Sequence, residues 1–335
     1  MPANRRILFA RRPQGLPVPE DFGADSVPCP EPGPGQFLAR TVWLSLDPYL
    51  RNVMKGHALY GVALRPGDPM HGETVARVVE SRHPQYASGD WVVVRNGWQE
   101  YGLSDGQGVR PLDPALAPPS TALGVLGMPG LTGYAGLVGV GQPRAGQTVL
   151  VSAATGPVGS TVGQVARLMG ARAIGIAGSA DKRRYAVEAL GFEACVDRHS
   201  ADLAGDLRRA CPDGVDVYFD NAGGAVLEAA LAQLAREARV VLCGMIDAYN
   251  RDGPPAHGPF LGPVVAARAS LHGFVVYDHL ERFAEFQHVV GGWIREGRFH
   301  YREDISEGLD SAPAAFCRLM RGENFGKSLV RVGPD

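Results

Sequence analysis

Residues 148–163, TVLVSAATGPVGSTVG, decide the fold of this chain. They begin with a short apolar run, 148–152, which is typical of a buried strand, and continue through a glycine-containing turn into a helical pattern. Gly156 and Gly159 lie at the expected turn, where a β-carbon would keep a pyrophosphate away from the N–H groups of a helix N-terminus. This order of elements favours a nucleotide site over the alternative, a plain tight turn.

Further along the chain, short apolar runs alternate with helical patterns. The expected strands cover residues 148–152, 173–177, 194–196, 215–219, 239–243 and 271–276. The expected helices cover residues 159–169, 181–190, 203–210, 225–234 and 280–296. Buried strands that alternate with helices predict a doubly wound parallel sheet with helices on both faces, and six strands suit a Rossmann domain.

The first third of the chain has a different pattern. Residues 36–46, 73–79 and 91–95 are rich in β-branched and aromatic side chains and are separated by Pro/Gly turns. Short mixed elements return near the C-terminus. The sequence therefore predicts an α/β protein in which a β-rich domain, residues 1–125 and 298–335, is interrupted by a Rossmann domain, residues 126–297.

Composition and charge exclude several classes of partner. The 335 residues carry 33 Lys and Arg against 35 Asp and Glu, a net charge of −2, so we expect no nucleic-acid partner. Residues 118–143 have no charged side chain, but recurrent glycines make them too weakly apolar for a membrane span. The N-terminal residues lack the apolar segment of a signal peptide, so we expect a cytoplasmic protein that does not enter a membrane.

Metal binding is not expected from the cysteine and histidine pattern. The five cysteines form no CxxC pair, and none lies near the only His-Gly-Glu segment, His71–Glu73, that resembles a zinc ligand pair. An odd, scattered set of cysteines also argues against a disulfide framework. We therefore predict no metal site.

The end of the second expected Rossmann strand indicates the nucleotide. An acidic residue there would bind the 2′-hydroxyl of NAD, but this strand ends in Ala-Gly-Ser, with Ser179 and then Lys182 able to donate to a 2′-phosphate. These residues favour NADPH. Two features keep alternatives open: Lys182 with its neighbours Arg183 and Arg184 could simply face solvent, and Asp181 would suit NAD.

Nine sequence blocks, in order along the chain, resemble one known family. They are SLDPYLR (45–51), GMPGLTGYAGL (127–137), VSAATGPVGSTVGQ (151–164), AGSADK (177–182), YFDNAGG (218–224), VVLCGMIDAYN (240–250), GFVVY (273–277), PAAF (313–316) and GENFGK (322–327). Together they resemble the zinc-independent medium-chain reductases of the prostaglandin reductase and leukotriene 12-hydroxydehydrogenase group. That group also contains plant alkenal double-bond reductases and bacterial curcumin reductase.

The resemblance implies a GroES-like catalytic domain beside the Rossmann domain, usually in a homodimer. It also implies NADPH-dependent reduction of the carbon–carbon double bond of α,β-unsaturated ketones and aldehydes, so that the partner is a small enone or enal. The strand-end residues and the resemblance together predict these cofactor-binding residues: Gly156, Pro157, Val158, Gly159, Ser160, Ser179, Lys182, Arg198, Asn221, Cys243, Gly244, Met245, Ile246, Tyr249, Phe274, Val275, Val276 and Asn324.

Two departures from the family pattern affect what the resemblance implies. Arg198 stands where the family often has a tyrosine that helps to hold the 2′-phosphate, and arginine can also bind phosphate. Residues 251–263, RDGPPAHGPFLGP, are a mixture of Gly, Pro and His that is particular to this chain, so its substrate range stays open.

Two tyrosines are candidates for catalysis. Hydride transfer to an enone builds negative charge on the carbonyl oxygen, and without a metal a hydrogen-bond donor must stabilise it. Tyr249 is the first candidate donor and Tyr60 the second. The alternatives are that the Tyr249 ring only stacks on the cofactor and that Tyr60 only packs. A quinone reductase and a non-catalytic NADPH-binding protein are the alternative functions.

Overall fold

The computed structural model describes residues 3–55, 62–251, 253 and 257–334. The chain divides into two compact units. Unit 1 comprises residues 1–124 and 303–335, and unit 2 comprises residues 125–302.

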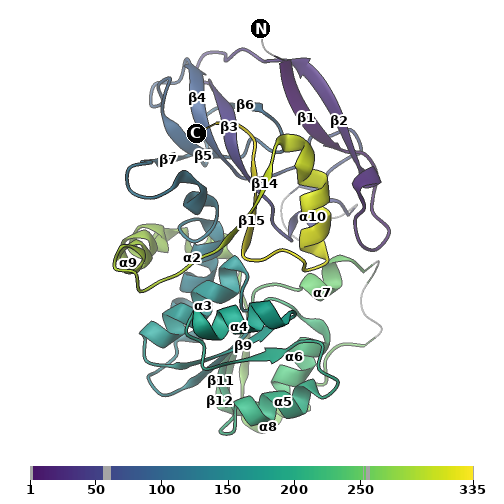
Figure 1. Cartoon of the computed structure of the whole chain (residues 1–335), viewed down its shortest axis with the longest axis vertical. Coiled ribbons are helices and arrows are strands. Elements are labelled where there is room, and N and C mark those ends of the chain that lie inside the picture. Colours follow the sequence, from purple (N-terminus) through teal and green to yellow (C-terminus); the bar gives the residue numbers. More distant parts are fainter. Residues whose placement is uncertain (1–2, 56–61, 252, 254–256, 335) are drawn as a thin grey trace. The chain divides into compact units, whose positions relative to one another are not determined.

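Unit 2 contains a six-stranded parallel sheet in the order β10-β9-β8-β11-β12-β13 (Figure 1). Its strands are β8 (Thr148–Ser152), β9 (Arg172–Ala177), β10 (Ala194–Asp197), β11 (Val215–Asp220), β12 (Leu234–Leu242) and β13 (Ser270–Gly273). In chain order this is the 3-2-1-4-5-6 arrangement of the Rossmann fold. The predicted doubly wound sheet is confirmed.

Helices connect these strands and also precede and follow the sheet. They are α2 (Met128–Ala135), the π-helix η3 (Gly136–Gly141), α3 (Pro157–Leu168), α4 (Ala180–Glu188), α5 (Leu203–Ala210), α6 (Gly224–Leu231), α7 (Ile246–Tyr249), α8 (Gly262–Ala267), the 3₁₀ helix η4 (Val276–Arg282) and α9 (Phe283–Arg295). The uncharged glycine-rich segment, residues 118–143, forms helices whose residues are mostly buried in the protein.

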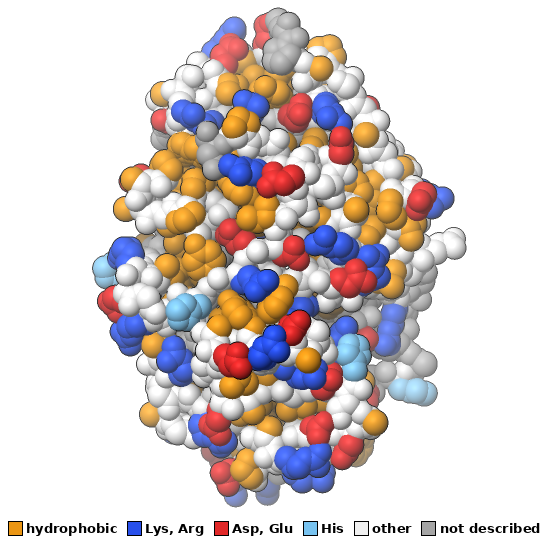
Figure 2. Space-filling model, viewed as in Figure 1, with side chains coloured by type: hydrophobic (Ala, Val, Ile, Leu, Met, Phe, Trp, Pro, Cys, Tyr) orange, Lys and Arg blue, Asp and Glu red, His pale blue; other side chains and the backbone are white. Residues whose placement is uncertain are grey.

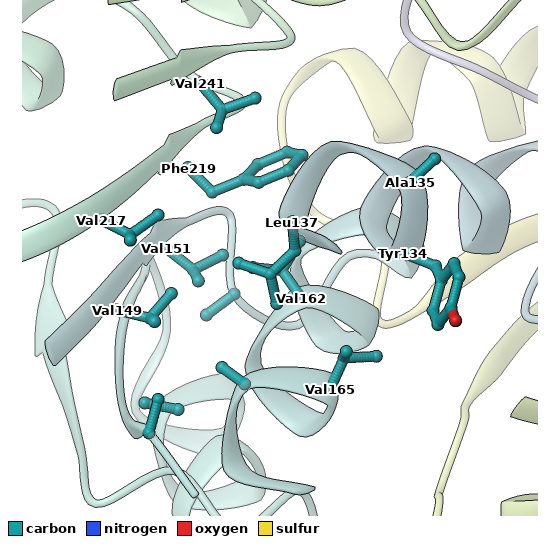
Figure 3. Close-up of a cluster of buried hydrophobic side chains, with 14 of the residues drawn as sticks. Tyr134, Ala135, Leu137, Val149, Val151, Val162, Val165, Val217, Phe219 and Val241 are labelled. Atoms are coloured by element: carbon teal, nitrogen blue, oxygen red, sulfur yellow. The ribbon is translucent and has the colours of Figure 1, made fainter. Parts of the chain in front are cut away.

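Alternate residues of the unit 2 strands enter two different cores, as expected for a sheet covered on both faces. On one face, Val149, Val217 and Phe219 pack with residues of α2, α3 and α9 (Figure 3). On the other face, Leu150 and Tyr218 pack with residues of α5 and α6. Neighbouring residues of one strand therefore serve opposite faces, which explains why these strands are apolar throughout.

One predicted boundary is wrong. A helix over 225–234 was expected, but α6 ends at Leu231 and Leu234 begins β12. Leu234 pairs with Val215 of β11, and the backbone of Glu237 adopts a positive φ of 61° where the strand register shifts. Pairing with a neighbouring strand has overridden a local helical preference, which sequence periodicity alone does not detect.

Unit 1 is β-rich, as predicted. A two-stranded sheet joins β1 (Ala3–Phe9) to β2 (Phe22–Pro28). A seven-stranded sheet has the order β14-β15-β3-β4-β5-β7, with β6 paired to β3. Its strands are β3 (Phe37–Ser45), β4 (Thr74–Ser81), β5 (Trp91–Val94), β6 (Tyr101–Ser104), β7 (Arg110–Leu112), β14 (Glu303–Glu307) and β15 (Lys327–Arg331). The helices are η1 (Pro19–Asp21), α1 (Leu50–Val53), η2 (Pro119–Leu123), η5 (Leu309–Ser311) and α10 (Ala312–Met320).

The surface and the helices also bear on the expected partners. On the face drawn in Figure 2, acidic and basic side chains are interspersed with hydrophobic ones rather than gathered by sign. Among the residues that the structure describes, no helix is long and apolar enough to cross a membrane.

Candidate cofactor and active site

The glycine turn follows β8 and leads directly into α3. Gly156 is the N-cap residue, and Pro157, Val158, Gly159 and Ser160 form the first helical turn. Pro157 has no N–H and the Ser160 N–H donates to the Gly156 carbonyl at 2.8 Å, so the N–H groups of Val158 and Gly159 are the ones in this turn that helix geometry leaves available for an anion.

The two glycines of this turn have different surroundings. A β-carbon on Gly159 would lie 2.3 Å from the carbonyl oxygen of Ala153, whereas one on Gly156 would lie 3.3 Å from the same atom. Gly159 is therefore required by the close approach of helix and strand, a role distinct from making room for a phosphate. At Gly156, by contrast, a β-carbon would not overlap the Ala153 carbonyl oxygen.

The ends of β9 and β10 bring three of the predicted residues to one place. The Ser179 hydroxyl caps α4 by accepting from the Lys182 backbone N–H at 3.3 Å, and the Lys182 side chain is half-buried. The Arg198 N–H donates to the Ala177 carbonyl at 3.0 Å, which fixes the end of β10 beside that of β9. Ser179, Lys182 and Arg198 thus lie at neighbouring strand ends.

Asp181, the residue that could favour NAD, points to a different partner. Its carboxylate accepts from the Arg184 guanidinium at 2.8 Å, one turn along α4. Both side chains are exposed. The structure therefore pairs this carboxylate with a cation of its own helix.

A buried hydrogen-bond network joins the ends of β8 and β11. The Asp220 carboxylate is fully buried and accepts from the Tyr218 hydroxyl at 2.6 Å and the Ser152 hydroxyl at 3.0 Å. It also accepts from the backbone N–H groups of Ala222 and Gly223. Burial and this carboxylate raise the pKa of Tyr218 well above its ordinary value, so its hydroxyl stays a donor.

The same network fixes Asn221, one of the predicted cofactor-binding residues. Its backbone N–H donates to the Ser152 hydroxyl at 2.7 Å, and its side-chain amide donates to the Ser152 carbonyl at 2.9 Å. Asp220 and Ser152 were not predicted as site residues. The signal was present in the sequence, because an Asp before Asn-Ala-Gly-Gly at a strand end is typical of a turn closed by its own carboxylate.

The segment after β12 carries five predicted residues. The N–H groups of Cys243 and Gly244 donate to the Asp220 carbonyl at 2.9 and 3.0 Å. Burial, reinforced by the Asp220 charge, raises the pKa of Cys243 to about 12. Met245 is exposed, and Ile246 begins the short helix α7.

Tyr249 ends α7 and is buried. Its hydroxyl accepts from the Met245 backbone N–H at 3.3 Å, so the hydroxyl lies over the start of its own helix. A hydroxyl that accepts one hydrogen bond can also donate one, because it carries one proton and two lone pairs. The structure is therefore compatible with donation by Tyr249.

The last Rossmann strand ends in the remaining predicted segment of unit 2. Phe274 is buried, donates its N–H to the Leu242 carbonyl at 3.0 Å and stacks on His279 with ring centroids 4.9 Å apart. Val276 is buried as well, while Val275 is 40% exposed.

Two predicted residues do not belong to this set. Asn324 lies in unit 1, where its side-chain amide donates to the Gly326 carbonyl at 2.8 Å. Tyr60 lies outside the described residues. The roles of both stay predictions.

All the predicted residues of unit 2 lie at the carboxyl ends of six adjacent parallel strands. The chain leaves β8 toward β9 on one side and returns through β11 on the other, so β8 and β11 flank the point where the strand order reverses. Open α/β sheets bind ligands at the carboxyl ends beside this point. Gly156 and Asn221 stand on its two sides.

Comparisons with known proteins identify the family of the chain. Residues 5–112 match a family described as the N-terminal domain of oxidoreductase, and residues 157–291 match one described as zinc-binding dehydrogenase. The NADPH-dependent curcumin reductase of Escherichia coli K12 is 47% identical, over 99% of this chain and 98% of that protein. The 2-alkenal reductase (NADP(+)-dependent) of Nicotiana tabacum is 36% identical, over 99% of this chain and 98% of that protein.

A solved structure extends the match to three dimensions. CurA from Vibrio vulnificus in complex with NADPH has a TM-score of 0.94 and 41% identity, covering 99% of this chain and 100% of that one. This chain belongs to the zinc-independent medium-chain dehydrogenases/reductases. The predicted family and fold are confirmed, and the chain is an oxidoreductase. Among the residues that the structure describes, no group of three His, Cys, Asp or Glu side chains could hold a metal ion.

Proposed function

We propose that this oxidoreductase uses NADPH to reduce the carbon–carbon double bond of α,β-unsaturated ketones and aldehydes. The observation that carries the proposal is the set of residues at the sheet's carboxyl edge, together with full-length relatives named curcumin reductase and 2-alkenal reductase. Within the chain, we assign cofactor binding to residues 126–297 and substrate recognition to residues 1–125 and 298–335.

The residues present suit NADPH at two points. The first turn of α3 presents the N–H groups of Val158 and Gly159, and Gly156 at its N-cap adds no side chain in front of them, so this turn suits a bound pyrophosphate. At the neighbouring strand ends, Lys182 and Arg198 supply positive charge and Ser179 a hydroxyl for a 2′-phosphate. We assign Asn221, Cys243–Ile246, Phe274–Val276 and Asn324 to the rest of the cofactor.

When bound, NADPH supplies a hydride for the β-carbon of the conjugated substrate. The chain's own contribution is to stabilise the negative charge that then develops on the carbonyl oxygen. We assign this role to the Tyr249 hydroxyl, because a phenol that accepts from the Met245 backbone N–H can also act as a hydrogen-bond donor. Tyr60 is the second candidate donor. Protonation of the α-carbon comes from Tyr249 or from water.

The test of the reaction is product analysis with deuterium-labelled NADPH and a panel of linear enals, enones and quinones. We expect saturated carbonyl products with deuterium on the β-carbon, and little turnover with NADH. Hydroquinone products alone would replace this proposal by a quinone reductase. Binding of NADPH without turnover of any substrate in the panel would favour a non-catalytic binding protein.

The Tyr249→Phe variant tests the donor. Because one lost oxyanion donor typically costs about 100-fold or more in kcat, we expect a loss of that size with NADPH affinity kept. Tyr86→Phe is the matched control, because its hydroxyl makes a long 3.4 Å bond to the Val109 carbonyl and it is not one of the residues assigned to the cofactor or to proton donation. Unchanged turnover in Tyr249→Phe would show that its ring merely packs.

We also propose that the protein is a cytoplasmic homodimer. β13 is an edge strand, and near it Phe260 and Val265 are 79% and 76% exposed, which is unusual for large apolar side chains on a monomer. All five cysteines are free thiols, which suits a reducing compartment. Light scattering on the purified protein should give twice the 35.6 kDa chain mass, and a monomer at micromolar concentration would contradict the dimer.

A further inference from the structure

An Arg–His pair lies at the end of β10. The Arg198 Nε–H donates to Nε2 of His199 at 3.0 Å, although both side chains are exposed. The pair lies over Gly178 at the end of β9. A β-carbon there would be 3.0 Å from Arg198 Nε and 3.5 Å from His199 Nε2.

The backbone beneath this pair is held from several directions. The His199 N–H donates to Asp197 Oδ1 at 2.9 Å, and the other Asp197 oxygen receives Arg183 at 2.7 Å. Arg183 in turn donates to the Gly178 carbonyl at 3.0 Å. Helix α4 and the turn after β10 are therefore connected through a carboxylate, so the place where the pair sits is well defined.

We propose that His199 is a positioning residue for the 2′-phosphate of the cofactor. Its neutral imidazole accepts from the Nε–H of Arg198 and so holds the guanidinium over Gly178, with the terminal N–H groups left for the phosphate. Gly178 contributes by keeping that space open. This inference rests on the proposed use of NADPH and adds to it a residue that selects between phosphorylated and unphosphorylated cofactors.

The charge of the imidazole decides its effect. A neutral ring accepts the Arg198 hydrogen bond, whereas a protonated ring has no acceptor and would repel the guanidinium. The other charged groups around it are Asp197 and Arg183 beneath the pair, Asp181, Lys182 and Arg184 on α4, and Asp202 and Asp206 after the turn. A neutral imidazole therefore positions the guanidinium, and a protonated one does not.

The experiment measures binding of adenosine 2′,5′-bisphosphate and of 5′-AMP by titration calorimetry at pH 8, without turnover. His199→Leu removes the acceptor, and we expect bisphosphate affinity to fall about 3- to 10-fold with 5′-AMP binding unchanged. His199→Gln keeps an acceptor and should retain the affinity. Gly178→Ala, which leaves both side chains in place but crowds them, should also weaken the bisphosphate selectively. His288→Leu, on an exposed part of α9, is the control.

A pH series separates positioning from direct binding. The ratio of wild-type to His199→Gln affinity cancels the titration of the ligand's own phosphate. We expect this ratio to fall from about 1 at pH 8 as the pH drops to 5.5. A rising ratio would mean that protonated His199 binds the phosphate itself, and equal affinities in His199→Leu and wild type would mean that it does nothing; either result overturns the proposal. If the wild type binds the bisphosphate no better than 5′-AMP, the proposed NADPH site fails first, and the role of His199 fails with it.

Discussion

Two pairs of strand ends in the same sheet are built in opposite ways. At the ends of β8 and β11, a fully buried Asp220 carboxylate accepts from two side-chain hydroxyls and two backbone N–H groups. At the ends of β9 and β10, exposed or half-buried side chains carry the polar groups, among them Lys182, Arg198 and His199. In the first region the polar groups are held by a buried hydrogen-bond network. In the second they are on side chains that are wholly or partly exposed to solvent.

This difference indicates that one region contributes to the stability of the fold and the other to the choice of cofactor. Removing one partner from a buried network leaves donors unsatisfied, so the central region cannot change without cost to the fold. Exposed ion pairs such as Asp181–Arg184 contribute about 0–1 kcal/mol, so the outer region can change at little cost. We infer that the central strand ends fix where a dinucleotide lies, while the outer ends decide which one is preferred.

The strongest test of this comparison is Asp220→Ala. The Tyr218 and Ser152 hydroxyls would lose their buried acceptor, so we expect a loss of about 3 kcal/mol in the free energy of unfolding, measured by urea denaturation. NADPH affinity should fall as well, because Asn221 is held through Ser152.

Asp216→Ala is the matched control on the same strand. Asp216 lies at the opposite end of β11, is only half-buried, and accepts from the Thr148 N–H at 2.8 Å. Its loss should cost about 1 kcal/mol with NADPH affinity unchanged. Equal destabilisation by the two substitutions would contradict a special role for the buried network.

The two glycines of the turn give the next largest effect. Gly159→Ala would place a β-carbon 2.3 Å from the Ala153 carbonyl oxygen, and we expect about 2 kcal/mol of destabilisation from this backbone overlap. In Gly156→Ala the same atom is 3.3 Å away and φ is −71°, so stability should change by about 0.5 kcal/mol or less. NADPH affinity should nevertheless fall about tenfold in Gly156→Ala, because the β-carbon occupies the phosphate approach. Unchanged affinity there would mean that the turn is only structural.

Much of the fold could be predicted from the sequence because its signals are local. An apolar strand, a glycine turn and a helix follow one another within residues 148–163, and the six strands were each marked by a short apolar run. The strand order follows from a fold class that has few topologies. Local periodicity gave the wrong element where strand pairing determined the structure: Leu234, at the end of a predicted helix, pairs with Val215 in the sheet.

Contacts between distant residues could not be predicted in this way. Lys327 lies 280 residues from Asp47 in the sequence, yet its Nζ lies 2.6 Å from the Asp47 carboxylate and both side chains are buried. The Asp220 network likewise joins residues 68 positions apart. No spacing rule connects such positions, so only the fold reveals them.

In the outer region, Lys182→Ala should change selectivity without changing the fold. Loss of one charge-assisted contact with a phosphate predicts about a tenfold weaker Kd for NADPH and an unchanged Kd for NADH. The free energy of unfolding should change by about 1 kcal/mol or less, because Lys182 is half-buried at the surface of α4. Arg184→Ala, which removes the exposed partner of Asp181 and Glu188, is the control and should leave both affinities unchanged. Equal weakening of NADPH and NADH in Lys182→Ala would show that this residue does not read the phosphate.

The last prediction is that the Cys243 thiol does not react with an alkylating reagent. Burial raises its pKa to about 12, so at pH 8 only about one thiol in 10⁴ is ionised, and iodoacetamide should not modify it in the folded protein. A cysteine introduced at the outer end, His199→Cys, should react readily at the same pH and be protected by adenosine 2′,5′-bisphosphate. Mass spectrometry of the labelled peptides measures both sites in one sample. Rapid labelling of Cys243 would mean that the end of β12, where the Cys243 N–H donates to the Asp220 carbonyl, opens to solvent, and the contrast with the outer strand ends would then fail.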